Sequence, residues 1–133
     1  MGTARVQGQR DVALNELPIR GIAINDATAN TAAVTVYPSD SGIIFVNKFA
    51  TATTYTLPAV ADSAGKMFWF FNVGAGGMLI TAPADTLVGE HDAAGTTITF
   101  DDTSHMIGVG GMAICDGTNY FWFNMCFTDP VIT

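Results

Sequence analysis

The stretch KMFWFFNVGAGGMLITA, from Lys66 to Ala82, decides the fold that the sequence predicts, and it has a later echo in AICDGTNYFWFNMC, from Ala113 to Cys126. A half-buried strand alternates apolar and polar residues, because successive side chains point to opposite faces. Neither block alternates, so both faces of these strands need cover, which in so small a chain another copy of the protein can provide. We therefore expect eight aromatic residues to form the core or a self-association surface: Phe68, Trp69, Phe70, Phe71, Tyr120, Phe121, Trp122 and Phe123.

The bulk composition also favours an assembled subunit. With 133 residues the chain has the size of one domain with a real core. Only 13% of its residues are charged, against roughly 25% in average soluble domains. A subunit buried in an assembly needs less charged surface than a monomer does. The net charge of -7 argues against a nucleic-acid partner, which would require a basic face.

Charge is unevenly distributed, and the first twenty residues read as a separate arm. Residues 1–20 carry a net charge of +1, whereas residues 21–133 carry -8. The arm has no sustained helical or strand period and ends near Leu17-Pro18. It is either a frayed terminus or an extended arm whose arginines meet acidic surface on a neighbour: Arg5, Arg10 and Arg20. We accordingly divide the chain into an N-terminal arm, 1–20, and a β-domain, 21–133.

We recognise no targeting signal or membrane helix in the sequence. The first twenty residues lack the apolar run of a secretory signal, and no run approaches the roughly 18–20 residues of a membrane helix. Val6 stands where a myristoylation motif needs Ser or Thr. We expect a soluble chain made in the cytoplasm.

Cys115 and Cys126 are predicted to be reduced, because a hairpin turn between them would leave them nearly 20 Å apart, at about 3.3 Å per residue.

From Gly21 onward the chain reads as short strands separated by Gly, Pro and Asp-rich turns, which predicts an all-β fold. We expect a small antiparallel β-sandwich or barrel, oligomeric, with the extended arm at its N-terminus. The Gly74–Gly77 run is predicted to make a tight glycine hairpin, and residues 59–65 a loop with one helical turn. The clearest hairpin turns at Asp116-Gly117, with Cys115 opposite Tyr120. The expected strands lie at 21–24, 33–37, 43–47, 53–57, 66–73, 78–81, 96–100, 112–115 and 119–127, with weaker ones at 86–89 and 105–109.

We find no constellation that indicates an enzyme. The loops at 101–105 and 90–92 gather acidic residues and a histidine, but neighbours in one loop rarely converge on a reacting atom. Neither loop has the ligand spacing of a calcium site, and a structural zinc site lacks its cysteines. The Gly74–Gly77 run is followed by a strand pattern instead of the helix that a phosphate cradle needs. The aromatic blocks could stack on bases or sugars, but base stacking requires a basic groove. We expect no catalysis, metal, cofactor or small-molecule substrate, and no membrane partner.

A series of short strings follows one another between residues 38 and 123: Asp40-Ser41-Gly42, Asn47, Thr56-Leu57-Pro58-Ala59, Gly65, Asn72, Gly74-Ala75-Gly76, Ile80-Thr81-Ala82-Pro83 and Cys115-Asp116-Gly117-Thr118-Asn119-Tyr120-Phe121-Trp122. This order of turns and strands resembles a module of bacteriophage head-decoration (capsid cement) proteins, which recurs in tail-fibre and tailspike modules. The resemblance implies a β-fold that trimerises and contacts the major capsid protein on the surface of the virion. The alternative is a tail-fibre or tailspike module that binds a receptor or glycan, but the chain has neither a long repeated shaft nor a receptor-binding tip.

Overall fold

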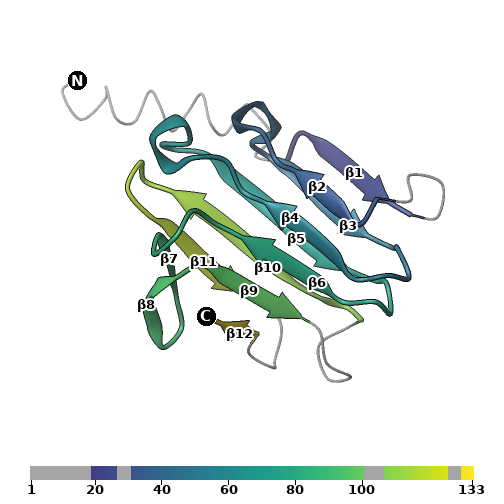
Figure 1. Ribbon diagram of the computed structural model, residues 1–133. Helices are drawn as coiled ribbons and strands as arrows, with labels where there is room; N and C mark the ends of the chain where they lie inside the picture. Colours follow the sequence, from purple (N-terminus) through teal and green to yellow (C-terminus); the bar gives the residue numbers. More distant parts are fainter. Residues whose placement is uncertain (1–18, 27–30, 101–106, 126–129) are drawn as a thin grey trace.

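The computed structural model describes residues 19–26, 31–100, 107–125 and 130–133, and within them the fold is all-β, as the sequence predicts. Two sheets pack face to face (Figure 1). The strands are β1 (Gly21–Asn25), β2 (Ala33–Thr35), β3 (Ile43–Asn47), β4 (Thr53–Thr56), β5 (Met67–Asn72), β6 (Met78–Thr81), β7 (Leu87–Gly89), β8 (Asp92–Gly95), β9 (Thr97–Phe100), β10 (Val109–Cys115), β11 (Tyr120–Asn124) and β12 (Val131–Ile132). Two short 3-10 helices, η1 (Pro38–Asp40) and η2 (Val60–Asp62), follow β2 and β4.

The first six strands alternate between the two sheets, so that the chain winds as three coils of a short parallel β-helix. β1, β3 and β5 pair in parallel in one sheet, and β2, β4 and β6 pair in parallel in the other. Gly21 lies beside Ile43 and Ile44 beside Trp69, so one coil takes 22 residues and the next takes 25. The prediction of a purely antiparallel sandwich is therefore wrong. Consecutive strands lie in different sheets, so each pairs with the strand one coil away, which runs in the same direction.

The remaining strands close the two sheets with mostly antiparallel pairs. The seven-stranded sheet has the order β1-β3-β5-β10-β11-β7-β8, and the five-stranded sheet has the order β12-β9-β6-β4-β2. The hairpin predicted at Asp116-Gly117 is confirmed: β10 and β11 are antiparallel, with Cys115 opposite Tyr120. The aromatic strands β5 and β11 lie on either side of β10 (Figure 1).

The glycine run between β5 and β6 is not a hairpin, so the hairpin predicted for Gly74–Gly77 is wrong. β5 and β6 belong to different sheets, and the run carries the chain across from one to the other. A Cβ at Gly74 would meet the carbonyl oxygen of Phe49, and one at Gly76 would meet that of Ala50. The Gly74 N–H donates to the carbonyl of Asn47 at 2.9 Å. Glycine is needed here because this corner stacks directly on the corner of the preceding coil.

Aromatic rings from both sheets fill the core. Phe45, Tyr55 and Phe70 form a triangle with ring centroids 5.5–5.7 Å apart. Trp122 lies 6.3 Å from Phe70 and connects this triangle to the C-terminal strands. These separations are those of edge-on and offset ring pairs, which add to the stability gained from burial alone. The inner faces of the two sheets thus pack against each other largely through aromatic side chains.

Two tyrosines in this core differ in how their hydroxyls are satisfied. The Tyr120 hydroxyl donates to the carbonyl of Pro58 at 2.8 Å. The Tyr55 hydroxyl is buried without a hydrogen-bond partner among the described residues, although the Asn25 side chain lies close enough to oppose part of the burial effect. Burial raises the pKa of each phenol from 10.0 to about 12.

The raised pKa values predict how the free energy of unfolding responds to pH. The difference in hydrogen bonding predicts what the loss of each hydroxyl costs. Between pH 10 and about pH 12 the unfolded chain loses phenolic protons that the folded chain keeps. The free energy of unfolding should therefore fall as the pH rises, by up to about 1.4 kcal/mol per pH unit for each tyrosine. Tyr55→Phe should be neutral or stabilising at pH 7, whereas Tyr120→Phe should cost about 1 kcal/mol. Denaturant unfolding at pH 7 and pH 11 measures both effects, and equal costs for the two variants would contradict the assignment.

Candidate functional site

The outer face of the seven-stranded sheet is apolar across five adjacent strands, and we call it the outer apolar face. Strand register places its residues in rows, which are listed here in strand order. The first row is Ile22, Ile44, Trp69, Met112 and Phe123; the second is Ile24, Val46, Phe71 and Gly110, with Met125 beside Gly110; the third is Met67, Ile114 and Phe121. Val88 of the next strand, β7, continues the third row beyond these five strands. None of these residues is charged or polar.

Much of this face is open in the single chain. The exposed fractions of its most open side chains are 63% for Ile22, 50% for Ile24, 43% for Phe71, 52% for Phe123 and 63% for Met125. A shallow hollow of about 290 Å³ lies within the face, and Trp69, Phe71 and Met125 are among the side chains that line it. Isolated exposed apolar residues are ordinary, but a contiguous set of this kind marks an interaction surface.

The eight aromatic residues singled out from the sequence divide evenly between the two faces of this sheet. Those pointing into the core are Phe68, Phe70, Tyr120 and Trp122. Those on the outer apolar face are Trp69, Phe71, Phe121 and Phe123. β5 and β11 both pair with β10. Their outward-facing aromatic side chains therefore lie on one continuous surface.

The five-stranded sheet provides an internal contrast. Its outer face is rich in threonine, as expected for a sheet face that meets water: Thr35, Thr54, Thr56, Thr81, Thr97 and Thr99. Both sheets contain three parallel strands, and parallel strands usually need cover on both faces. Because only the seven-stranded sheet keeps an apolar exterior, we assign its exterior, and not the other, as the candidate interface.

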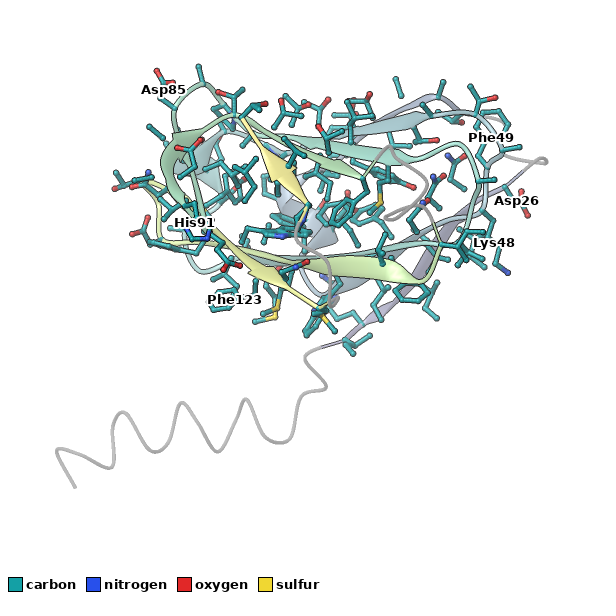
Figure 2. The ribbon with its side chains drawn as sticks, turned by 90° about the horizontal axis from the view of Figure 1, so that it is seen from below. Asp26, Lys48, Phe49, Asp85, His91 and Phe123 are labelled. Atoms are coloured by element: carbon teal, nitrogen blue, oxygen red, sulfur yellow. The ribbon has the colours of Figure 1, made fainter. Side chains whose placement is uncertain are left out.

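Within the described ranges the outer apolar face carries no charged side chain, and Arg20 stands at its edge, beside Gly42. Figure 2 shows Asp26 and Lys48 at one end of the strands and Asp85 and His91 toward the other, with Phe123 on the face between them. Glu90 and His91 approach each other at 3.5 Å on the surface. The acidic balance of the β-domain therefore does not repel a partner that approaches the outer apolar face.

A ladder of buried asparagines, which the sequence analysis missed, joins the three coils. Asn25, Asn47 and Asn72 stand side by side at the ends of β1, β3 and β5. The Asn25 side-chain amide donates to Asn47 Oδ1 at 3.2 Å, and that of Asn47 donates to Asn72 Oδ1 at 2.9 Å. All three are at most 6% exposed. The recurrence of an apolar residue followed by Asn at 24–25, 46–47 and 71–72 was the signal that could have revealed the repeat.

Of the three arginines assigned to the N-terminal arm, only Arg20 lies within the described residues. Its backbone N–H donates to the carbonyl of Gly42 at 2.8 Å. Its guanidinium donates to the carbonyls of Ser39 and Ser41, each at 3.0 Å. Arg20 thus anchors the start of β1 to the corner of the next coil. Arg5 and Arg10 lie outside the described residues.

The described residues offer little chemistry beyond association. They include no group of three or more His, Cys, Asp or Glu side chains that could hold a metal ion. Cys115 is a buried free thiol, and burial raises its pKa; Cys126 and the loop at 101–105 lie outside the described ranges. No helix in the described part of the chain is long and apolar enough to cross a membrane. The site with the clearest physical meaning is therefore the outer apolar face.

Comparisons with protein-family models, with curated proteins and with solved structures found no match.

Proposed function

We propose that this protein is a structural virion protein that decorates and stabilises a bacteriophage capsid, as a homotrimer that contacts the major capsid protein. The observation that carries the proposal is the outer apolar face, which supports association with another protein surface. The phage capsid and the trimer come from the resemblance of residues 38–123 to head-decoration proteins. On this proposal the protein catalyses no reaction, and it acts through buried area alone.

The size of the outer apolar face supports an interface. Five strands about 4.8 Å apart and three rows about 6.8 Å apart cover roughly 480 Å² in projection. The largest apolar patch on a typical monomer is about 300–600 Å² and is often functional. A standard interface buries about 800 Å² on each partner, so this face supplies the apolar centre of such an interface and leaves a polar rim to be added.

The charge distribution supports a second copy as the partner on this face. Residues 21–133 carry -8 in total, so two copies that met through charged surfaces would repel each other. On the outer apolar face no charge is brought against a like charge. The capsid contact is then left to other parts of the chain, including Arg5 and Arg10.

Binding of the purified protein to capsids of the encoding phage that lack it tests the proposed function. We expect saturable binding, with regular added density on the capsid surface in electron micrographs. A folded oligomer that does not bind these capsids at any concentration would overturn the proposal. Binding to isolated tails instead would establish the alternative tail module.

One observation favours that alternative, a glycan-binding tail module. Tyr37 is 60% exposed and lines a second hollow, to which the polar residues Thr31 and Thr35 also contribute. Sugar sites combine an exposed ring with polar partners, and the outer apolar face offers no such partners. Glycan-array binding that is lost in Tyr37→Ala would support it.

The arm gives a further prediction. The double variant Arg5→Glu, Arg10→Glu should lose at least tenfold in capsid affinity, because on this proposal the two arginines of the arm meet acidic surface on the capsid. The oligomer should persist, because the proposal assigns self-association to the outer apolar face and not to the arm. Lys66→Glu and Lys48→Glu together change the net charge equally and serve as the control in a co-sedimentation assay. Equal loss in both double variants would show a general charge effect and rule out a specific role for the arm.

A further inference from the structure

The first coil leaves one end of the sandwich open. β1 is the last strand of the seven-stranded sheet at this end, and β2 is the last strand of the five-stranded sheet. Among the described strands each of them pairs on one side only, β1 with β3 and β2 with β4. Figure 1 shows the two strands at the same end of the molecule. Coiled folds require a cap at such an end, because the last coil otherwise exposes both its core and its strand edges.

A hollow of about 390 Å³ lies between these two edge strands. Its floor includes Ala23 and Val34 from the first coil and Phe45 and Tyr55 from the second. Tyr55 contributes the buried hydroxyl that has no partner among the described residues. The hollow is therefore an unfilled extension of the hydrophobic core.

The backbone of β2 also has hydrogen-bonding groups directed away from the sheet. Thr54 donates to the carbonyl of Ala32 at 2.8 Å, and Val36 donates to that of Thr56 at 2.9 Å. In a parallel pair, alternate residues of a strand direct both backbone groups to the same neighbour. The N–H and C=O groups of Ala33 and Thr35 consequently point to the open edge, where a further parallel strand could bind them.

The chain itself arrives at this end. Arg20 is hydrogen-bonded to the corner residues Ser39, Ser41 and Gly42, which connect β2 to β3. Ile19 and Arg20 therefore stack on the corner between β2 and β3, one layer beyond it toward the open end of the sandwich. In the two described corners of this kind, a strand of the five-stranded sheet comes before the corner: β2 precedes the corner that leads to β3, and β4 precedes the corner that leads to β5.

The sequence repeats across this corner. Leu17-Pro18, Tyr37-Pro38 and Leu57-Pro58 are spaced by 20 residues. In the structure Pro38 and Pro58 each come shortly after a strand of the five-stranded sheet, β2 and β4. Residues 12–17 hold the equivalent position before Pro18. Val12 and Leu14 are two residues apart, so in a strand both would point to the same face.

We propose that residues 12–17 of the same chain add a parallel strand to the open edge of β2, and that Val12 and Leu14 fill the hollow between β1 and β2. The N-terminal segment is then divided in two. Residues 12–17 cap the coil, while residues 1–11, which carry Arg5 and Arg10, extend from the cap. The proposal concerns the isolated chain and does not depend on capsid decoration.

Residue-resolved amide hydrogen exchange tests this proposal, comparing the full chain with a variant that lacks residues 2–17. The amides of Ala33 and Thr35 should exchange at least tenfold more slowly in the full chain. The amide of Val36, which bonds to β4, should exchange similarly in both and reports that β2 remains folded. Rapid and equal exchange of Ala33 and Thr35 in both proteins would overturn the proposal.

A substitution in β2 tests the same proposal without the deletion, which could destabilise the whole protein. Thr35→Pro removes one outward N–H and keeps the bonds from β2 to β4, since proline is tolerated on an edge strand whose N–H faces away from the sheet. It should release residues 12–17 to fast exchange, whereas Thr35→Val should not. Protection of Ala33 and Thr35 that disappears on dilution to monomers would assign the occupant to a neighbouring copy and refute the same-chain cap.

Discussion

Replacing Phe71 by glutamate is expected to leave the protein as folded monomers, if the outer apolar face is the proposed self-association surface. Phe71 lies in the middle of the outer apolar face, between Val46 on β3 and Gly110 on β10, and is 43% exposed in the single chain. A carboxylate at this position would lose its water when a second copy covers the face, and nothing on the face could pair with it. We expect the self-association constant to fall at least about 100-fold, equivalent to roughly 3 kcal/mol.

Sedimentation velocity over a range of micromolar concentrations measures this change. Tyr37→Glu is the matched control, because it introduces the same charge at an aromatic residue that is 60% exposed but lies off the face. The control should sediment like the original protein. If Phe71→Glu also does so, or if the original protein is a monomer at these concentrations, the outer apolar face is not the interface.

The second large effect is expected in stability, from the centre of the asparagine ladder. Asn47 is fully buried, and its amide donates to Asn72 Oδ1 at 2.9 Å and to the carbonyl of Gly77 at 3.2 Å. Asn47→Ala removes the donor of both of these hydrogen bonds. It also removes one acceptor of the Asn25 amide, which still donates to the Thr31 carbonyl at 2.7 Å and to Thr53 Oγ1 at 3.3 Å. Each buried group left unsatisfied costs about 1–3 kcal/mol, so the free energy of unfolding should fall by about 3 kcal/mol or more.

Urea unfolding followed by tryptophan fluorescence measures this loss. Asn119→Ala is the control, because its amide makes one hydrogen bond, to the Thr86 carbonyl at 3.3 Å, at a less buried turn. The control should cost about 1 kcal/mol or less. A similar small cost for Asn47→Ala would mean that the ladder does not hold the coils together.

Local signals in the sequence predicted the elements that depend on neighbouring residues. The Asp116-Gly117 hairpin was placed in the correct register, with Cys115 opposite Tyr120, because an Asp-Gly turn restricts both flanking strands. The helical turn expected within 59–65 is present as η2. Most strands lie within one or two residues of their predicted positions, since Gly and Pro interrupt the chain at several of the connections, as at Pro38, Pro58 and Gly74.

Other local predictions failed where contacts distant in sequence decide the structure. Gly110 and Gly111 were expected to break a strand, but β10 continues through both of them. A Cβ at Gly110 would meet the Phe70 carbonyl, and one at Gly111 would meet the Trp122 ring. These glycines allow β10 to pack closely between the two aromatic strands. Residues 92–95, expected in a polar loop, form β8 because they pair with β7.

The parallel coils were the largest feature that the sequence did not reveal. Strands that pair are 21 to 25 residues apart, and the interval changes between coils. No turn chemistry specifies such a pairing, because its register is set by stacking of corners and by the asparagine ladder. The same glycine run that predicted a hairpin serves equally well as a crossover between sheets.

By itself the sequence determined that the protein is all-β, and that the strands at 66–73 and 119–127 need cover on both faces, because their side chains do not alternate in polarity. Only the tertiary structure decided which alternate set of side chains on each strand faces the core. Phe68, Phe70, Tyr120 and Trp122 point to the five-stranded sheet, and Trp69, Phe71, Phe121 and Phe123 point outward. The side-chain period of two separates the halves, but which half meets the core depends on where the second sheet lies.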